Sequence, residues 1–493
     1  MSVAIPDQVE TSVCCPAYFL AAPASGQGKT TVTAALARYL RNQGIRVRVF
    51  KTGPDYLDPQ ILEQASGHPV EQLDLWMAGE DYCRQALHQA AQDADLILVE
   101  GAMGIFDGEP SSADLAACFG IPVILVMDVK GMAQTAAAIA AGLAGFRQDI
   151  NLVGVIANHC GSERHAQLIR DNLPESLPLI ATMPRNPELA LPERHLGLVQ
   201  ASEVRQELEE RFEAGAKALA AGGIEASELF ALKTSLDTGL IKKIGLDEKN
   251  GSSENSRPGK TNETKGVLFQ APVAAREGGL GRPLQGLRVG IAKDEAFSFI
   301  YAANLRLLNE LGAQFEFFSP LHDSEPGSVD AIWLPGGYPE LYAEVLSANE
   351  PMKEAIRQHF IQQRPILAEC GGFLYCLETL TDLDENTFNM LGLIPGKGMM
   401  RGKRGCQGMQ TAVLPEGEVQ AHAHHRSRSF DTPEPIGYGR RQRHSAPGEP
   451  IFRLQGLTAT YLHLFFPSNP EAVAALFYRK ATISGDQEIS CVV

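Results

Sequence analysis

The stretch AYFLAAPASGQGKTT, residues 17–31, decides the fold of the first half of the chain. Residues 17–22 are apolar and predict a buried strand, and Thr30–Arg41 has the pattern of a helix. The loop between them ends in Gly28-Lys29-Thr30, at the strand–helix junction that a Walker-type phosphate-binding loop requires. Pro23 stands where the standard pattern has its first glycine. The stretch therefore predicts a nucleotide-binding α/β domain.

The chemistry of this loop suits ATP. Backbone N–H groups of small residues can approach phosphate oxygens, and the start of a helix adds a favourable field. We expect Lys29 to reach the terminal phosphates and the Thr30 hydroxyl to bind Mg²⁺. The expected ATP-binding residues of the loop are Ser25, Gly26, Gln27, Gly28, Lys29, Thr30 and Thr31.

Apolar runs alternate with helix-like segments in the first half and again from about Leu287. Such alternation predicts parallel sheets covered by helices on both faces. The expected strands are 17–22, 47–51, 96–100, 122–128 and 152–158, then 288–292, 314–318, 331–334 and 365–368. Helices are expected at 30–41 and 81–92.

The composition changes between the two halves. Asp247–Lys265 has almost no large apolar residues, so it cannot bury enough surface to offset its ordering entropy. We therefore predict a nucleotide-binding domain at 15–232, a flexible linker at 233–285 and a second α/β domain at 286–480.

Length, charge and cysteine content narrow the class of protein. A chain of 493 residues is too long for one domain of about 100–200 residues. Its net charge of −16 argues against general binding to nucleic acid or anionic membranes. The longest apolar runs, such as Ile121–Met127, fall far short of the roughly 20 residues of a membrane span. With no signal-peptide pattern and nine scattered cysteines, we expect a cytoplasmic protein with reduced thiols.

Two acidic motifs follow other strands of the first half. In Lys51–Pro59, Asp55 is placed to hold Mg²⁺ or to position a substrate, at the strand ends where open α/β sheets bind ligands. In Val99–Gly108, Glu100 is placed like a Walker B acid, and Asp107 beyond a glycine-rich turn could contact substrate or metal. The expected metal ligands are Thr30, Asp55 and Glu100, with the choice between the two acids left open.

The second half carries a candidate nucleophile, Cys370. It follows an apolar strand and precedes two glycines, which is typical of a nucleophile elbow. A thiol needs a base, and His463 is the best candidate. The backbone N–H groups of Gly337 and Gly371 are expected to form an oxyanion hole. ATP bound at the phosphate loop can activate a carboxylate, and a cysteine glutaminase at Cys370 can release ammonia from glutamine. The two sites together therefore predict a glutamine-dependent amide synthetase.

These motifs resemble those of the cobyrinic acid a,c-diamide synthase family. The resemblance rests on Ser25–Thr31, Lys51–Pro59, Glu100–Gly108 and Val155–His165, and on the Cys370 region, which resembles class I glutamine amidotransferases. It implies a dethiobiotin-synthetase-like nucleotide domain, with Asn158 on the adenine side of ATP. It also implies a corrinoid substrate, which we expect to contact Asp55, Tyr56, Leu57 and Asp107.

The resemblance implies a reaction. ATP phosphorylates the a- and c-acetate carboxylates of cobyrinic acid, and ammonia from L-glutamine displaces phosphate from each acyl phosphate. The ring could instead be metal-free hydrogenobyrinic acid or a nickel sirohydrochlorin, because the motifs do not report the central metal. A homodimer is an expectation from P-loop relatives. A P-loop regulatory ATPase is disfavoured, because such a protein would not need Cys370 and His463. Carboxylation of the dethiobiotin-synthetase kind is disfavoured too, because it would not need a glutaminase.

Two positions depart from the family pattern. Phe465 stands where wider relatives have an acid and this family often has a second histidine, which suggests a Cys–His dyad. Ala423 replaces the glutamate of the Gly-His-Glu-Phe-His motif, although His422 and His425 keep their spacing. A metal site at this histidine cluster is disfavoured, because no cysteine or acid accompanies it at ligand spacing.

Overall fold

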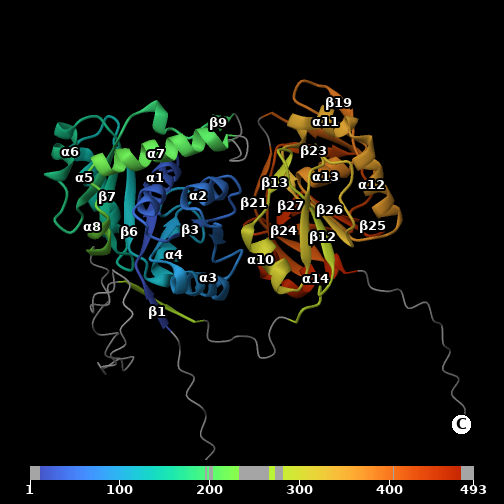
Figure 1. Ribbon diagram of the computed structural model, residues 1–493, viewed down its shortest axis with the longest axis horizontal. Coiled ribbons are helices and arrows are strands. Elements are labelled where there is room, and N and C mark those ends of the chain that lie inside the picture. Colours follow the sequence, from blue (N-terminus) through green and yellow to red (C-terminus); the bar gives the residue numbers. More distant parts are fainter. Residues whose placement is uncertain are drawn as a thin grey trace, which may run out of the picture. The chain divides into compact units, whose positions relative to one another are not determined.

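The computed structural model describes residues 12–194, 197–198, 204–231, 266–271, 281–402 and 405–478. The chain divides into two compact units, Met1–Glu277 and Gly278–Val493, which we describe separately (Figure 1). Of the expected linker, residues 233–265 and 272–280 lie outside the described residues.

The first unit is built on a sheet of seven parallel strands. Their apolar, β-branched runs are buried, as expected of strands covered on both faces. The strand order is β4 (Glu71–Leu73), β3 (Val47–Thr52), β5 (Leu96–Glu100), β2 (Ala17–Ala21), β6 (Val123–Asp128), β7 (Leu152–Cys160) and β8 (Leu179–Pro184). The predicted parallel α/β fold is confirmed for this half.

Helices cover both faces of this sheet (Figure 1). Alternate residues of β2 enter different cores: Tyr18 and Leu20 pack on one side, and Phe19 on the other. One face carries α1 (Lys29–Asn42), α2 (Asp58–Ser66), α7 (Arg205–Ala221) and α8 (Ala226–Ala231). The other carries α3 (Glu80–Asp93), α4 (Ser112–Phe119), α5 (Gln134–Phe146) and α6 (Glu163–Arg170).

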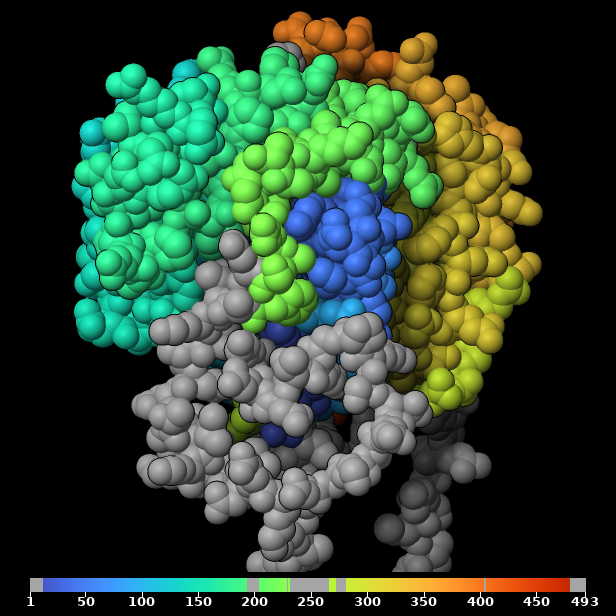
Figure 2. Space-filling model, turned by 60° about the vertical axis from the view of Figure 1, so that its left-hand side comes forward, coloured from blue at the N-terminus to red at the C-terminus, as the bar shows by residue number. Residues whose placement is uncertain are grey.

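Helix α7 is held against α1 by a buried cation. The Arg38 guanidinium, on α1, lies 2.7 Å from the Glu209 carboxylate and 2.9 Å from that of Glu213, both on α7. Figure 2 shows green atoms of α7 directly beside blue atoms from the N-terminal part of the unit. Because these two carboxylates lie on successive turns of α7, their ion pairs with Arg38 hold α7 against α1.

A short two-stranded sheet joins distant parts of the first unit. Strand β1 (Ser12–Cys15) pairs antiparallel with β11 (Val267–Gln270), and Ser12 lies opposite Gln270. Strand β11 falls inside the segment expected to be a flexible linker, so that expectation was wrong for residues 267–270. The reason is burial, because Val267 and Phe269 pack into the core of the first unit. A second small pair is β9 (Glu193–Arg194) with β10 (Gly197–Leu198).

The second unit has a mixed sheet of ten strands. Five neighbouring strands are parallel: β14 (Gln314–Phe318), β12 (Arg288–Ala292), β15 (Ala331–Leu334), β17 (Ile366–Glu369) and β26 (Leu457–Thr460). The sheet continues in antiparallel fashion through β25 (Pro447–Leu454), β24 (Gly437–Arg441), β21 (Cys406–Leu414), β22 (Gly417–His425) and β27 (Leu462–Leu464). The predicted α/β fold of this half is confirmed, with an antiparallel extension that the sequence pattern did not predict.

Smaller elements complete the second unit. A four-stranded sheet contains β19 (Thr387–Asn389), β18 (Thr379–Thr381), β20 (Lys397–Met400) and β23 (Ser427–Phe430), and β13 (Phe297–Phe299) pairs with β16 (Gly336–Gly337). The helices are α10 (Ala302–Glu310), α11 (Ala343–Ala348), α12 (Glu350–Ile361), α13 (Gly371–Cys376) and α14 (Pro470–Phe477). Within the described ranges, every helix is too short or too polar to span a bilayer.

Candidate functional site

The phosphate loop connects β2 to α1, as the sequence predicts. Asn158 lies near the C-terminal end of β7. Its Nδ2 donates to the Gln27 carbonyl oxygen, in the loop, at 3.0 Å. The Gln27 side chain in turn accepts from the Asp128 backbone N–H at 2.9 Å. The structure therefore brings Asn158 to the loop that precedes it by more than a hundred residues. The fold places these two expected ATP-binding elements side by side.

Lys29 points from the start of α1 toward the turn after β5. Its Nζ donates to the Met103 carbonyl oxygen at 2.5 Å and to that of Ala24 at 3.4 Å. Burial, and then repulsion by Lys51, lower the pKa of Lys29 to about 8. A bound polyphosphate would favour the charged ammonium again. The geometry suits a lysine that exchanges backbone carbonyls for phosphate oxygens.

Oxygen ligands converge beside Lys29, and Asp58 is one of them. The Thr30 hydroxyl lies 3.1 Å from Glu100 Oε1 and 3.2 Å from Asp58 Oδ2. The buried Lys51 ammonium lies 2.9 Å from the Asp58 carboxylate and 3.1 Å from that of Glu100. Burial opposes the charge on Lys51, but the carboxylates of Asp58 and Glu100 raise its pKa overall. Hydroxyl and carboxylate oxygens are the donors that Mg²⁺ prefers.

Asp55 and Asp107 make different contacts. Asp55 Oδ1 accepts from the backbone N–H groups of Leu57 and Asp58, each at 3.0 Å, so it supports the turn that starts α2. Its other oxygen is 3.9 Å from Lys51. Asp107 is exposed, and its carboxylate accepts from the Gly104 N–H at 3.1 Å. Of the acids in these two motifs, Asp58 and Glu100 lie within hydrogen-bonding distance of Thr30, whereas Asp55 bonds to its own turn.

Cys370 lies at a sharp turn between β17 and α13. Its φ of 45° is in the left-handed region, which L-residues seldom adopt, and its backbone N–H donates to the Thr460 carbonyl oxygen at 2.8 Å. The thiol contacts the His424 carbonyl oxygen at 3.8 Å. Burial, and then the carboxylate of Glu340, raise the pKa of Cys370. The thiol is therefore protonated at rest and needs a base to become a nucleophile.

His463 and the predicted oxyanion residues lie around this turn. His463 belongs to β27, which follows β26, the parallel neighbour of β17. A side-chain carbon on Gly336 would lie 2.1 Å from His463 Cε1, and one on Gly371 would lie 2.9 Å from the Gly337 nitrogen. The glycines thus allow the segment after β15 to approach both the histidine ring and the cysteine turn. Burial lowers the pKa of His463, so its imidazole is neutral at rest.

Glu369 is a buried acid that the sequence analysis missed. Its Oε2 accepts from Trp333 Nε1 at 2.9 Å and its Oε1 from the Leu464 backbone N–H at 2.8 Å. Burial raises the pKa of Glu369 to about 8. Glu369 immediately precedes Cys370, and Leu464 immediately follows His463. The hydrogen bond between them therefore connects the cysteine turn to the strand that carries the histidine. The sequence did contain a signal for this residue, because Glu369 is an acid at the end of an otherwise apolar strand.

Comparisons with known proteins match this two-part arrangement. Residues 18–199 match the model described as "CobQ/CobB/MinD/ParA nucleotide binding domain", and residues 288–471 match "CobB/CobQ-like glutamine amidotransferase domain". A hydrogenobyrinate a,c-diamide synthase of Stutzerimonas stutzeri is 47% identical, over 94% of this chain and 99% of that protein. That of Pseudomonas aeruginosa is also 47% identical, over 94% and 98%. A cobyrinate a,c-diamide synthase of Herminiimonas arsenicoxydans is 42% identical, over 92% and 94%.

The chain belongs to the a,c-diamide synthase family. It joins a nucleotide-binding domain to a glutamine amidotransferase domain, so the predicted ATP- and glutamine-dependent enzyme class is confirmed. The roles of individual residues stay predictions. In this a,c-diamide synthase family member, Lys51 forms an ion pair with Asp58, Asp58 accepts a hydrogen bond from Thr30, and Glu369 accepts one from Trp333.

Proposed function

We propose that this protein amidates the a- and c-carboxylates of cobyrinic acid, with ATP as activator and glutamine as nitrogen donor. One observation carries the proposal: a phosphate loop with converging oxygen ligands and a cysteine elbow with a buried neutral histidine occur in one chain. The same reaction on hydrogenobyrinic acid is the second candidate. It is favoured by the two relatives of 47% identity that carry that name.

In the synthetase half, the protein orients a carboxylate and the γ-phosphate and neutralises the developing charge. Lys29 is the proposed cation at the terminal phosphates. The oxygen donors of Thr30, Asp58 and Glu100 fit Mg²⁺, which would supply further charge neutralisation. Asp55, Tyr56, Leu57 and Asp107 are proposed to face the corrinoid, with Asp55 also shaping the turn that carries Asp58.

In the glutaminase half, Cys370 is the proposed nucleophile and His463 the base. His463 takes the thiol proton while the sulfur bonds to the glutamine side-chain carbonyl carbon, and the same proton leaves on ammonia as the C–N bond breaks. Water then hydrolyses the thioester to glutamate. The N–H groups of Gly337 and Gly371 are proposed to stabilise the oxyanion.

Mass analysis after incubation with MgATP and glutamine tests the reaction. Cobyrinic acid, hydrogenobyrinic acid and nickel sirohydrochlorin are offered separately. We expect two successive mass changes, each corresponding to replacement of a carboxyl hydroxyl by an amino group. The ring that is amidated fastest is identified as the natural substrate. Glutamine hydrolysis with no amidated product in any of the three would overturn the substrate assignment and leave the glutaminase assignment intact. We also infer a cytoplasmic location and a homodimer, which fractionation and light scattering would test.

A further inference from the structure

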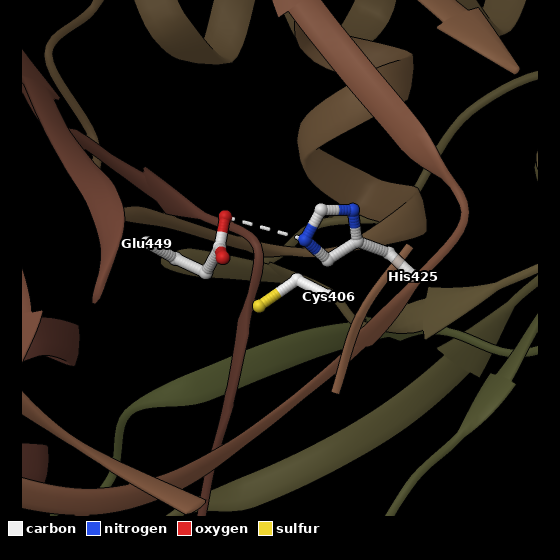
Figure 3. Close-up of side chains that lie close together, drawn as sticks. All are labelled: Cys406, His425 and Glu449. Carbon is white, nitrogen blue, oxygen red and sulfur yellow. Dashed lines mark ion pairs between the residues drawn. The ribbon is translucent and has the colours of Figure 1, made fainter. Parts of the chain in front are cut away.

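Three side chains with metal-binding atoms meet in the antiparallel part of the second unit. Cys406, on β21, lies directly opposite His425, on β22, and Glu449 comes from β25. Figure 3 shows the thiol, the imidazole and the carboxylate pointing toward one another. One donor atom from each residue lies within 4.8 Å of the other two. The sheet therefore places beside His425 a cysteine and an acid that are separated from it in the sequence.

The hydrogen bonding of His425 decides which ring nitrogen is available. Its Nδ1 lies 3.2 Å from the Ser427 carbonyl oxygen. A carbonyl can only accept, so this hydrogen bond needs the proton on Nδ1, and the Ser427 hydroxyl, 3.5 Å from the same nitrogen, can accept from it too. The other nitrogen, Nε2, lies 3.2 Å from Glu449 Oε2. An imidazole lone pair and a carboxylate repel each other, so a proton or a cation belongs between them. Metal-binding histidines characteristically have their second nitrogen held in this way.

The surroundings favour a cation at this point. The His425 side chain is 7% exposed and that of Glu449 is 10% exposed, and the Tyr461 ring stacks on the imidazole at 3.9 Å. Burying a carboxylate without compensating charge is unfavourable. Arg441 lies at the edge, 3.7 Å from Glu449 and donating to Cys406 Sγ at 3.5 Å, so a single guanidinium faces the carboxylate and would also face the thiolate. Cys406 itself is half-buried, which gives solvent access for a fourth ligand.

We propose that Cys406, His425 and Glu449 bind a divalent transition-metal ion of the Zn²⁺ type, with solvent as the fourth ligand. Sulfur, nitrogen and oxygen donors together suit tetrahedral Zn²⁺, whereas Mg²⁺ and Ca²⁺ prefer oxygen alone. Binding releases the Cys406 thiol proton. The site is separate from the proposed Mg²⁺ ligands, which lie in the other unit, and does not depend on the proposed reaction.

The site has a consequence for the nucleophile. The residue before His425 presents its carbonyl oxygen to Cys370 Sγ at 3.8 Å. A metal that ties the end of β22 to β21 and β25 would hold this carbonyl in place. We therefore assign the metal a structural role beside the glutaminase centre.

Cobalt is the probe for the test. The full chain, stripped with EDTA and free of corrinoid, is titrated with Co²⁺ while near-ultraviolet thiolate-to-cobalt absorption is recorded. We expect one equivalent to produce the band and Zn²⁺ to abolish it. Cys406→Ser should remove the band, and Glu449→Gln should keep it but weaken Co²⁺ binding by roughly 10–100-fold or more. Thiolate absorption excludes the oxygen ligands of the nucleotide site as its source.

Matched controls separate this site from other thiols and imidazoles. The exposed Cys118 and the exposed His444 provide Cys118→Ser and His444→Gln, both of which should keep the band and the affinity. The band should also persist in Cys370→Ser. A wild-type protein without the band would overturn the proposal in favour of a proton shared by His425 and Glu449. A band that survives Cys406→Ser would overturn the ligand assignment.

Discussion

At the scale of single residues, Cys370 combines a strained backbone with a protonated, buried thiol. Cys370→Ala removes the nucleophile but leaves the phosphate loop untouched. We expect loss of glutamine-dependent amidation and retention of synthesis with an added ammonium salt, since free ammonia replaces the missing product. Rates with the two nitrogen sources check this. Continued use of glutamine by the variant would remove Cys370 from its proposed role.

Of the two aspartates in the Lys51–Pro59 motif, Asp58 and not Asp55 accepts a hydrogen bond from Thr30. Asp58→Asn should lower the synthesis rate by about 100-fold and raise the Mg²⁺ concentration needed for half-maximal rate, because a charged oxygen ligand is lost. Asp55→Asn is the matched change, and its amide oxygen can still accept the two N–H bonds of the turn. Its Mg²⁺ dependence should stay near that of the wild type. A larger Mg²⁺ shift in Asp55→Asn than in Asp58→Asn would reverse the assignment.

At the scale of elements, Glu369 joins β17 to the strands that carry Trp333 and Leu464. Its pKa of about 8 in the folded state exceeds the roughly 4.3 of an unfolded glutamate. The folded state therefore favours the protonated acid, so its contribution to stability is complete below about pH 4.3 and is lost as pH rises through about 8.

Glu369→Gln should flatten the fall in melting temperature between these pH values, because an amide does not ionise. Melting followed by circular dichroism at a series of pH values measures this. The exposed Glu434 offers Glu434→Gln as a matched control that should leave the curve unchanged. An unaltered slope in Glu369→Gln would show that Glu369 does not titrate across this range.

The elements that could be predicted from the sequence are those whose pattern lies within one continuous segment of the chain. The strands before Lys29, Glu100 and Cys370 could be predicted because apolar runs end at polar or glycine-rich turns. The antiparallel strands β21 to β25 were missed, as was the meeting of Cys406, His425 and Glu449. That meeting depends on cross-strand register, which residue spacing along the chain does not encode.

At the scale of the whole molecule, the chain carries two chemistries that single substitutions should separate. Lys29→Ala should lower amidation by about 100-fold or more with either glutamine or ammonium, because both nitrogen sources need the activated carboxylate. Glutamine hydrolysis should survive, since Cys370 and His463 belong to the other unit. Assays of glutamate release and of amide formation on one sample provide the measurement. Normal amidation with either source would exclude Lys29 from phosphate binding.

The pairing of β1 with β11 has a consequence for biosynthesis. As the ribosome releases the chain, Ser12–Cys15 emerges long before its partner strand Val267–Gln270, which follows only after the sheet and helices of the first unit have been made. Phe269 and Val267 are also among the last side chains to enter that core. Translation arrested before residue 267 would therefore release a nucleotide-binding fold with one unpaired strand, a surface that chaperones and proteases recognise.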